Sequence, residues 1–145
     1  MIVITDSNII FSALITPNGT VAQILKAKSR LQFFAPSYLF EEVNRHLAKI
    51  EELSPLNRRQ LKAEIKAFKE AITIIETKDI PKKYYLEAYD IVIDIDFDDV
   101  FFVALNRYTH YKIWTLDTQL RKGLEKKGYN ICITTTEIKK SLYKK

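Results

Sequence analysis

The sequence is poor in the residues that interrupt or cross-link a chain. Only 3 Gly and 4 Pro occur among 145 residues, which excludes a collagen-like or linker-rich protein. The single cysteine, Cys132, excludes an internal disulfide and is typical of a reducing compartment. No apolar run approaches the roughly 18 residues of a membrane span, and the N-terminus lacks the pattern of a signal peptide. A cytoplasmic protein without membrane contact is therefore expected.

What the chain does contain is ordinary globular composition. Hydrophobic residues make up 47% and charged residues 28%, which excludes disorder over most of the length. No repeat, low-complexity segment or linker divides the sequence. The length is that of one ordinary domain, so residues 1–145 are predicted to form a single domain.

The charge is unevenly distributed. The chain carries 23 basic and 18 acidic residues, for a formal net charge of +5, which favours a polyanionic partner. Five aspartates (Asp90, Asp94, Asp96, Asp98 and Asp99) lie within ten residues, and the other 135 residues carry 23 bases and 13 acids, a net charge of +10. At the basic C-terminus, Lys139, Lys140, Lys144 and Lys145 form either a solvated tail or a phosphate-binding edge.

Short β-rich segments alternate with helical ones along the chain. The pattern predicts strands at 2–5, 31–35, 72–75, 112–115 and 131–133. It predicts helices at 7–14, 20–28, 37–52, 54–71, 81–91, from 96 onward, after Asp117 to about 128, and from Thr135 or Thr136 onward. Strands separated by helices indicate an α/β fold with a mostly parallel sheet covered on both faces.

Two aspartates follow predicted strands. Asp6 comes directly after the strand at 2–5, and Asp117 comes just after the strand at 112–115. Each can serve simply as a helix N-cap. In open parallel sheets, however, ligands bind beyond the carboxyl ends of the strands. If these strands are neighbours, both carboxylates should face one crevice.

Further carboxylates lie at predicted helix starts, and two pairs of alternatives remain open. Glu41 and Glu42 both occupy early turns of the helix at 37–52, with Glu42 closer to its apolar stripe. In the acidic run, Asp96 and Asp99 are three residues apart and share a face, whereas Asp98 is better placed for solvent.

The acidic run needs something to offset its internal repulsion, and bound cations are the natural candidates. The alternative is a solvated acidic loop. Oxygen ligands without a His or Cys cluster favour Mg²⁺ or Mn²⁺, as one or two ions, over zinc. Such ions activate water for attack on a phosphodiester, and a basic surface attracts the nucleic-acid backbone. The pattern therefore favours a metal-dependent nuclease.

Four segments, in this order, resemble the PIN-domain ribonucleases across essentially the whole chain. They are Val3 to Leu14, Pro36 to Val43, Asp96 to Leu105 and Ile113 to Leu120. The resemblance implies a three-layer α/β/α sandwich and a metal-dependent endoribonuclease acting on RNA. A non-catalytic PIN-like module that binds RNA or protein is the alternative.

The resemblance also implies the site residues. The catalytic acids would be Asp6, Glu42, Asp99 and Asp117. The metal ligands would be Asp6, Asp96, Asp99 and Asp117, with Asn8 and Thr115 as supporting residues. Many small members are VapC-like toxins of toxin–antitoxin pairs, so an antitoxin protein is a further candidate partner. A homodimer is also expected.

Overall fold

The structure, a computed structural model, describes residues 1–27 and 29–143. Lys28, the predicted end of the second helix, and Lys144 and Lys145 of the predicted tail lie outside the described residues. Five strands form one sheet in the order β3-β2-β1-β4-β5, and every neighbouring pair is parallel. The strands are β1 Ile2–Thr5, β2 Gln32–Pro36, β3 Ile72–Ile75, β4 Lys112–Trp114 and β5 Cys132–Ile133.

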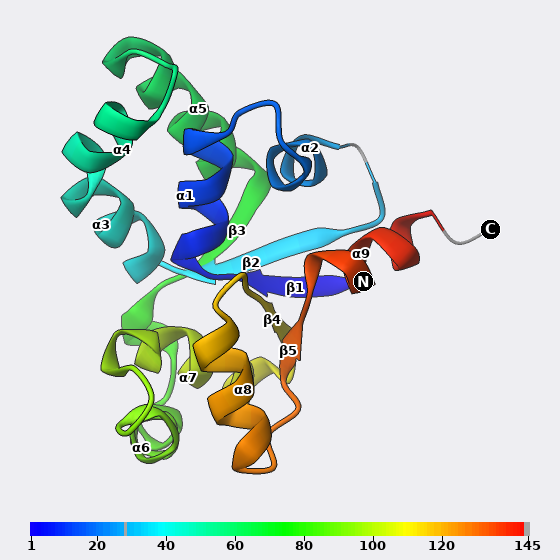
Figure 1. The fold of residues 1–145 in the computed structure, drawn as a ribbon. Helices are drawn as coiled ribbons and strands as arrows, with labels where there is room; N and C mark the ends of the chain where they lie inside the picture. Colours follow the sequence, from blue (N-terminus) through cyan, green and yellow to red (C-terminus); the bar gives the residue numbers. More distant parts are fainter. Residues whose placement is uncertain (28, 144–145) are drawn as a thin grey trace.

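Helices cover both faces of this sheet, and Figure 1 shows α1 to α5 on one side and α6 to α8 on the other. The α-helices of the described residues are α1 Ser7–Ile15, α2 Thr20–Lys26, α3 Tyr38–Arg45, α4 Leu47–Leu53, α5 Arg58–Ala71, α6 Lys82–Val92, α7 Val100–Thr109, α8 Thr118–Lys126 and α9 Thr135–Leu142. Two 3₁₀ turns are η1 Thr77–Asp79 and η2 Phe97–Asp99. The predicted three-layer α/β/α sandwich with a parallel sheet is confirmed.

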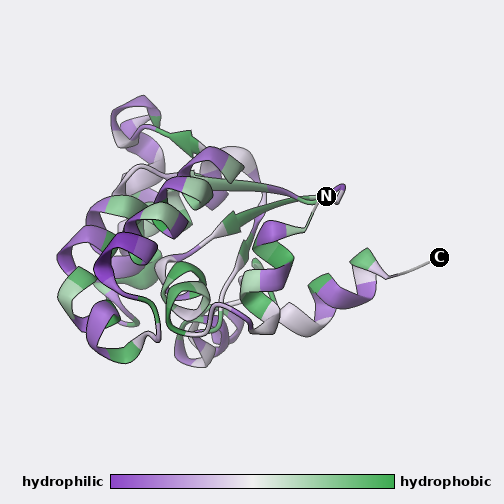
Figure 2. Cartoon of the chain, turned by 90° about the horizontal axis from the view of Figure 1, so that it is seen from above, coloured by the Kyte–Doolittle hydropathy of each residue, from purple (hydrophilic) through white to green (hydrophobic). Residues whose placement is uncertain are grey.

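The core lies between the sheet and its helices. Val3 and Ile4 of β1 are at most 1% exposed, and Trp114 of β4 is fully buried. Strands buried on both faces read as continuous apolar runs, and the strands in Figure 2 are largely green, whereas the surrounding helices carry both purple and green. Cys132 is also buried, as a small core residue in β5. This packing fixes the strand ends from which the candidate site residues project.

Two helix boundaries differ from the predictions. The helix predicted at 37–52 is two helices, α3 and α4, separated at His46, whose backbone leaves the helical region at φ −101° and ψ 12°. The helix predicted to begin at Ser54 begins at Arg58 instead, with Asn57 in a capping box. Ser54 is used elsewhere, since its hydroxyl donates to the Leu14 carbonyl at 2.6 Å. The contact of Ser54 joins distant segments and is absent from local patterns, whereas the Asn57–Gln60 capping box is a local motif that the predicted start at Ser54 overlooked.

Strand order is the property that positions the site. β1 is central and pairs with β2 on one side and β4 on the other. The carboxyl ends of β1 and β4 therefore meet at the same edge of the sheet. Among the described residues, no helix is both long enough and apolar enough to cross a membrane.

Candidate metal centre

Asp6 and Asp117 lie at adjoining strand ends. β1 and β4 are paired with Thr5 opposite Trp114, Asp6 follows β1 directly, and Asp117 follows β4 after two residues. Both side chains line the same hollow. The strands are neighbours, so the condition for a shared crevice is met.

Each of these aspartates is also the N-cap of the helix that follows. Oδ1 of Asp6 accepts the Ile9 N–H at 3.2 Å, and Oδ1 of Asp117 accepts the Leu120 N–H at 3.1 Å. The two interpretations of these residues are therefore compatible. Capping uses one carboxylate oxygen and holds the side chain in place, and it leaves the other oxygen of each carboxylate out of the cap.

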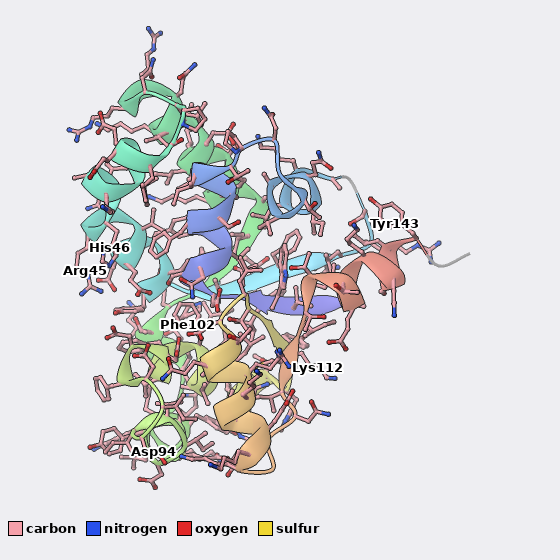
Figure 3. The ribbon with its side chains drawn as sticks, viewed as in Figure 1. Arg45, His46, Asp94, Phe102, Lys112 and Tyr143 are labelled. Atoms are coloured by element: carbon pink, nitrogen blue, oxygen red, sulfur yellow. The ribbon has the colours of Figure 1, made fainter. Side chains whose placement is uncertain are left out.

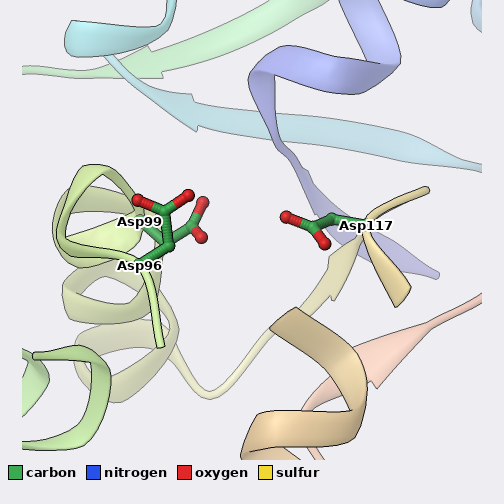
Figure 4. A group of neighbouring side chains, drawn as sticks. All are labelled: Asp96, Asp99 and Asp117. Carbon is green, nitrogen blue, oxygen red and sulfur yellow. The ribbon is translucent and has the colours of Figure 1, made fainter. Parts of the chain in front are cut away.

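Asp96 and Asp99 face Asp117 across the hollow. They come from the turn that begins α7, opposite the end of β4, as Figure 4 shows. Each of the three residues offers a carboxylate oxygen, and these oxygens lie within 4.8 Å of one another. Asp6 lines the same hollow but is outside this closest group. All four predicted metal ligands therefore line one hollow, and the oxygens of three of them are close enough together to bind one ion.

Asp98 and Asp99 occupy different environments. Asp98 is exposed, and its backbone N–H donates to Oδ1 of Asp96 at 3.0 Å. Asp99 is half-buried, and its Oδ2 atom is buried without a hydrogen-bond partner in the described part of the chain. Asp98 lies at the rim of the hollow, whereas Asp99 joins the closest group of oxygens. The structure therefore favours Asp99 of the two.

Glu41 and Glu42 also lie in different environments. Glu42 is half-buried, lines the acidic hollow, and accepts a hydrogen bond from the Ser7 hydroxyl at Oε1. Glu41 is exposed and faces a different hollow between α3 and α5, with Phe40 and Lys69. Of the pair, the structure places Glu42 with the other acids.

The hollow itself is small, at about 90 Å³. This volume suits ions and water better than an organic molecule. Eight residues line it: Asp6, Ser7, Asn8, Glu42, Asp96, Asp98, Asp99 and Asp117. Six of the eight are acidic and none is basic.

Burial and crowding change the acid strength of these groups. Burial, reinforced by the charges of Asp117 and Glu42, raises the pKa of Asp6 to about 7. Burial, followed by repulsion from Asp96 and Asp6, raises the pKa of Asp99 to about 8. Burial is also the main reason why the pKa of Glu42 is raised. Without a cation, the hollow therefore resists full ionisation.

A divalent cation fits this donor set. The buried Oδ2 of Asp99 has no hydrogen-bond partner among residues 1–27 and 29–143, and leaving such an oxygen unpaired is costly. Hard cations such as Mg²⁺ and Mn²⁺ take carboxylate oxygens as ligands. An ion among Asp96, Asp99 and Asp117 would pair that oxygen and offset the repulsion between the carboxylates.

The two predicted supporting residues differ in position. Thr115 is buried, and its hydroxyl accepts the Asp117 N–H at 2.9 Å. Hydrogen bonding from the same side chain opposes the rise in the pKa of Asp6. Asn8 is exposed at the rim of the hollow. Thr115 therefore connects the two capping aspartates, whereas Asn8 is an exposed residue of the lining.

Ser7 is the residue to which the sequence interpretation assigned no role. It is 6% exposed and donates to Glu42, 35 positions further along the chain. In the sequence, Ser7 shares the helical spacing of Ile10 and Leu14 and is therefore a polar residue on an apolar helix face. In the structure, all three residues are buried.

Known proteins share the family and the fold of this chain. A family model described as "PIN domain" matches residues 4–142. The chain belongs to the PIN-domain family. The extent of the domain, 1–145, stays a prediction, since the match covers all but a few residues at each end. No match to a curated protein is found.

A solved structure shares the fold of this PIN domain. It is a chain of VapBC2 from Rickettsia felis, in a crystal structure bound to a DNA fragment from their promoter. The two chains are 15% identical with a TM-score of 0.66, and the match covers 92% of this PIN domain and 97% of the other chain. At this identity, the likeness concerns the fold alone.

Proposed function

We propose that this PIN domain is a metal-dependent endoribonuclease that hydrolyses phosphodiester bonds of single-stranded or structured RNA with Mg²⁺ or Mn²⁺. The observation that carries the proposal is the buried, unpartnered Oδ2 of Asp99 within a group of converging carboxylates. A carboxyl group in this environment must either keep its proton or bind a cation to ionise, and none of the eight residues that line the hollow is basic. Membership of the PIN-domain family supports the nuclease class.

Asp96, Asp99 and Asp117 would hold the ion, with Asp6 at the adjoining strand end. When bound, the metal would supply Lewis-acid chemistry, lowering the pKa of a water and neutralising phosphate charge. The caps at Ile9 and Leu120 fix two of these carboxylates before any substrate arrives. Such preorganisation limits reorganisation during the reaction.

Two hydroxyl groups position the acids. Ser7 donates to Oε1 of Glu42 and holds this carboxylate toward the hollow. Thr115 accepts the Asp117 N–H at 2.9 Å and steadies the turn after β4. Groups of this kind orient metal ligands and tune their basicity. Glu42 would complete the site from the α3 side.

The charge distribution supports a polyanionic substrate. Outside residues 90–99, the chain carries a net charge of +10. A basic surface attracts a nucleic-acid backbone, whereas an empty acidic hollow would repel it. A bound cation removes this conflict at the point where a phosphodiester must lie.

An antitoxin partner is part of the same proposal. The solved structure with the shared fold is a chain of VapBC2, bound to DNA from the promoter, and this supports a toxin role with a small antitoxin. A location in the cytoplasm is proposed with it. Growth arrest on expression, relieved by the product of a neighbouring open reading frame, is the expected result. A homodimer is proposed as well, and light scattering on the purified protein would test it.

The nuclease proposal is tested with labelled RNA in the presence of Mn²⁺, Mg²⁺ or EDTA. Cleavage is expected with either ion and absent in EDTA. Asp6→Asn and Asp117→Asn are the sharpest variants, because asparagine preserves an N-cap while removing the charge. If both variants cut RNA as fast as the parent, the assignment of the site is wrong, and a parent that binds RNA without cutting it would indicate a non-catalytic module.

A further inference from the structure

Arg45 is a basic residue close to the acidic hollow but outside its lining. It is the last residue of α3, one helical turn after Glu42. Figure 3 shows Arg45 beside His46, where α3 ends, and the side chain is exposed. The same helix therefore presents an acid to the hollow and a cation to its surroundings.

Tyr38 holds this cation in place. The Arg45 guanidinium donates from Nη2 to the Tyr38 hydroxyl at 2.8 Å, and its Cζ lies 5.4 Å from the centre of the Tyr38 ring. The ring is itself anchored, because it packs against Phe101 at 4.5 Å and Phe102 at 6.2 Å between centroids. These phenylalanines belong to α7, which Asp99 precedes. Arg45 is thus oriented by the element that carries the buried acid.

Arg45 has no acidic partner, unlike the arginines that form ion pairs. Three other arginines are within 4.0 Å of a carboxylate, in the pairs Arg58–Glu51, Arg107–Glu87 and Arg121–Glu125. Over residues 1–27 and 29–143, Arg45 forms no such pair. A guanidinium donates through five N–H groups, and most of those of Arg45 remain available to a ligand.

The charge of Arg45 nevertheless reaches the hollow. The Tyr38 hydrogen bond, together with smaller contributions from Glu42 and Asp98, raises the pKa of Arg45. In turn, Arg45 opposes the rise in the pKa of Glu42 that burial causes. The guanidinium is therefore near enough to interact with both acids without being paired to either.

We propose that Arg45, oriented by Tyr38, binds a phosphate of the RNA strand next to the acidic hollow. This inference rests on the proposed nuclease function and names a substrate-positioning residue for it. An RNA strand with one phosphate at the metal centre must place a neighbouring phosphate nearby. A planar guanidinium binds phosphate oxygens in bidentate fashion, and a guanidinium held by a tyrosine loses less freedom when it does so.

The first test compares three variants in RNA cleavage with Mn²⁺. Arg45→Gln should raise KM by about tenfold, in line with the loss of one charged hydrogen-bonding group, with little change in kcat. Tyr38→Phe keeps the ring and removes the hydroxyl acceptor, so a smaller rise in KM is expected. Arg59→Gln is the matched control, since Arg59 is an exposed arginine of α5 that also forms no ion pair in the described part of the chain.

A second test measures binding without chemistry. Fluorescein-labelled oligouridylates, each carrying one uncharged methylphosphonate in place of a phosphate, are mixed with the protein and Mn²⁺ by stopped flow, so that binding is read before cleavage. For the parent, one linkage should weaken binding when its charge is removed. For Arg45→Gln, changing that same linkage should weaken binding no further. The binding constant of Arg45→Gln for RNA should also depend less on salt, with a slope of log K against log salt smaller by about 0.7 than that of the parent.

The two tests separate the inference from the proposed function. If the parent cuts no RNA with either metal, the nuclease proposal fails, while the binding cycle still decides the role of Arg45. If Arg45→Gln and Arg59→Gln bind equally well, and every methylphosphonate position affects Arg45→Gln as it affects the parent, the phosphate contact is overturned.

Discussion

The two halves of the acidic run at residues 90–99 have opposite environments. Asp94 is exposed and contacts the Lys127 ammonium, whose hydrogen bond lowers the pKa of Asp94. Asp99, five residues later, is half-buried, and burial raises its pKa to about 8. Figure 3 shows Asp94 at the outer end of the molecule, whereas Figure 4 shows Asp99 facing Asp117.

The difference shows that local acid density alone does not mark a cation site. Asp94 already has a cation within the protein, because Lys127 from α8's C-terminal end contacts both this carboxylate and, at 2.6 Å, the Ile91 carbonyl. The charges that act most strongly on Asp99 are those of other acids, and one of its oxygens is buried without a hydrogen-bond partner among the described residues. Burial without an internal cation is therefore what distinguishes the proposed metal centre.

The largest expected effect separates these two aspartates directly. Asp99→Asn should reduce RNA cleavage by about 10³-fold or more, as removal of preorganised charge at a reacting centre does. Asp94→Asn should leave cleavage within about twofold, since exposed ion pairs contribute little. Single-turnover cleavage of labelled RNA with Mn²⁺ measures both. An equal loss of cleavage in the two variants would show that Asp94 and Asp99 do not have different roles.

Ser7→Ala should have the next largest effect. Removing the hydroxyl frees Glu42 to turn away, and loss of a group that orients a site acid costs about 10–100-fold in activity or metal affinity. Ser7→Thr retains a hydroxyl and should recover part of the activity. Unchanged cleavage in Ser7→Ala would show that Glu42 needs no support.

Metal-free stability should depend on pH in the direction set by the hollow. The pKa values of Asp6 and Asp99 rise from 3.8 to about 7 and about 8 on folding. The folded state therefore retains protons that the unfolded state has lost, and stability falls as pH rises from near 3.8 through 8. Melting in EDTA should show this fall, with about 2–4 °C lost per kcal/mol.

Two controls sharpen the pH experiment. Asp99→Asn should flatten the decline, because it removes the group with the higher pKa. Saturating Mn²⁺ should raise the Tm of the parent more at pH 8 than at pH 5. A parent whose Tm in EDTA rises across this range would contradict the assigned environments.

The smallest effect is expected for the stability of Asp94→Asn. Its carboxylate is exposed, so its loss should shift the Tm less than any substitution within the hollow. Thermal melting of the Asp94→Asn and Asp99→Asn proteins at pH 8 makes the comparison. The two shifts in Tm should also have opposite signs, because Asp99→Asn should melt at a higher temperature than the metal-free parent.

Much of the fold could be predicted from the sequence, because strands and helices leave local patterns. The five strand positions and the capping role of Asp117 followed from apolar runs and cap chemistry. Strand order did not, since pairing between β1 and β4 joins segments more than a hundred residues apart. The hydrogen bond of Ser54 to Leu14 likewise joins distant segments, whereas the capping box that begins α5 at Asn57 is a local motif that the predicted start at Ser54 overlooked.

Part of the candidate site could also be predicted from the sequence. Asp6, Asp96, Asp99 and Asp117 stood at strand ends and helix starts, where parallel sheets gather ligands. Ser7 left only the signal of a polar residue on an apolar helix face, and Arg45 left none, because their contacts with Glu42 and Tyr38 exist only in the folded chain. The roles of the aspartates in metal binding and catalysis, and the role of Arg45 in substrate binding, stay predictions.

The most direct measurement is a titration of Mn²⁺ into the metal-free protein by isothermal calorimetry near neutral pH. The parent and Asp94→Asn should bind the ion equally well, with proton release as the acids of the hollow ionise. Asp99→Asn should bind it at least about tenfold more weakly. Equal binding by Asp99→Asn and the parent, or loss of binding in Asp94→Asn, would contradict a metal centre built on Asp99.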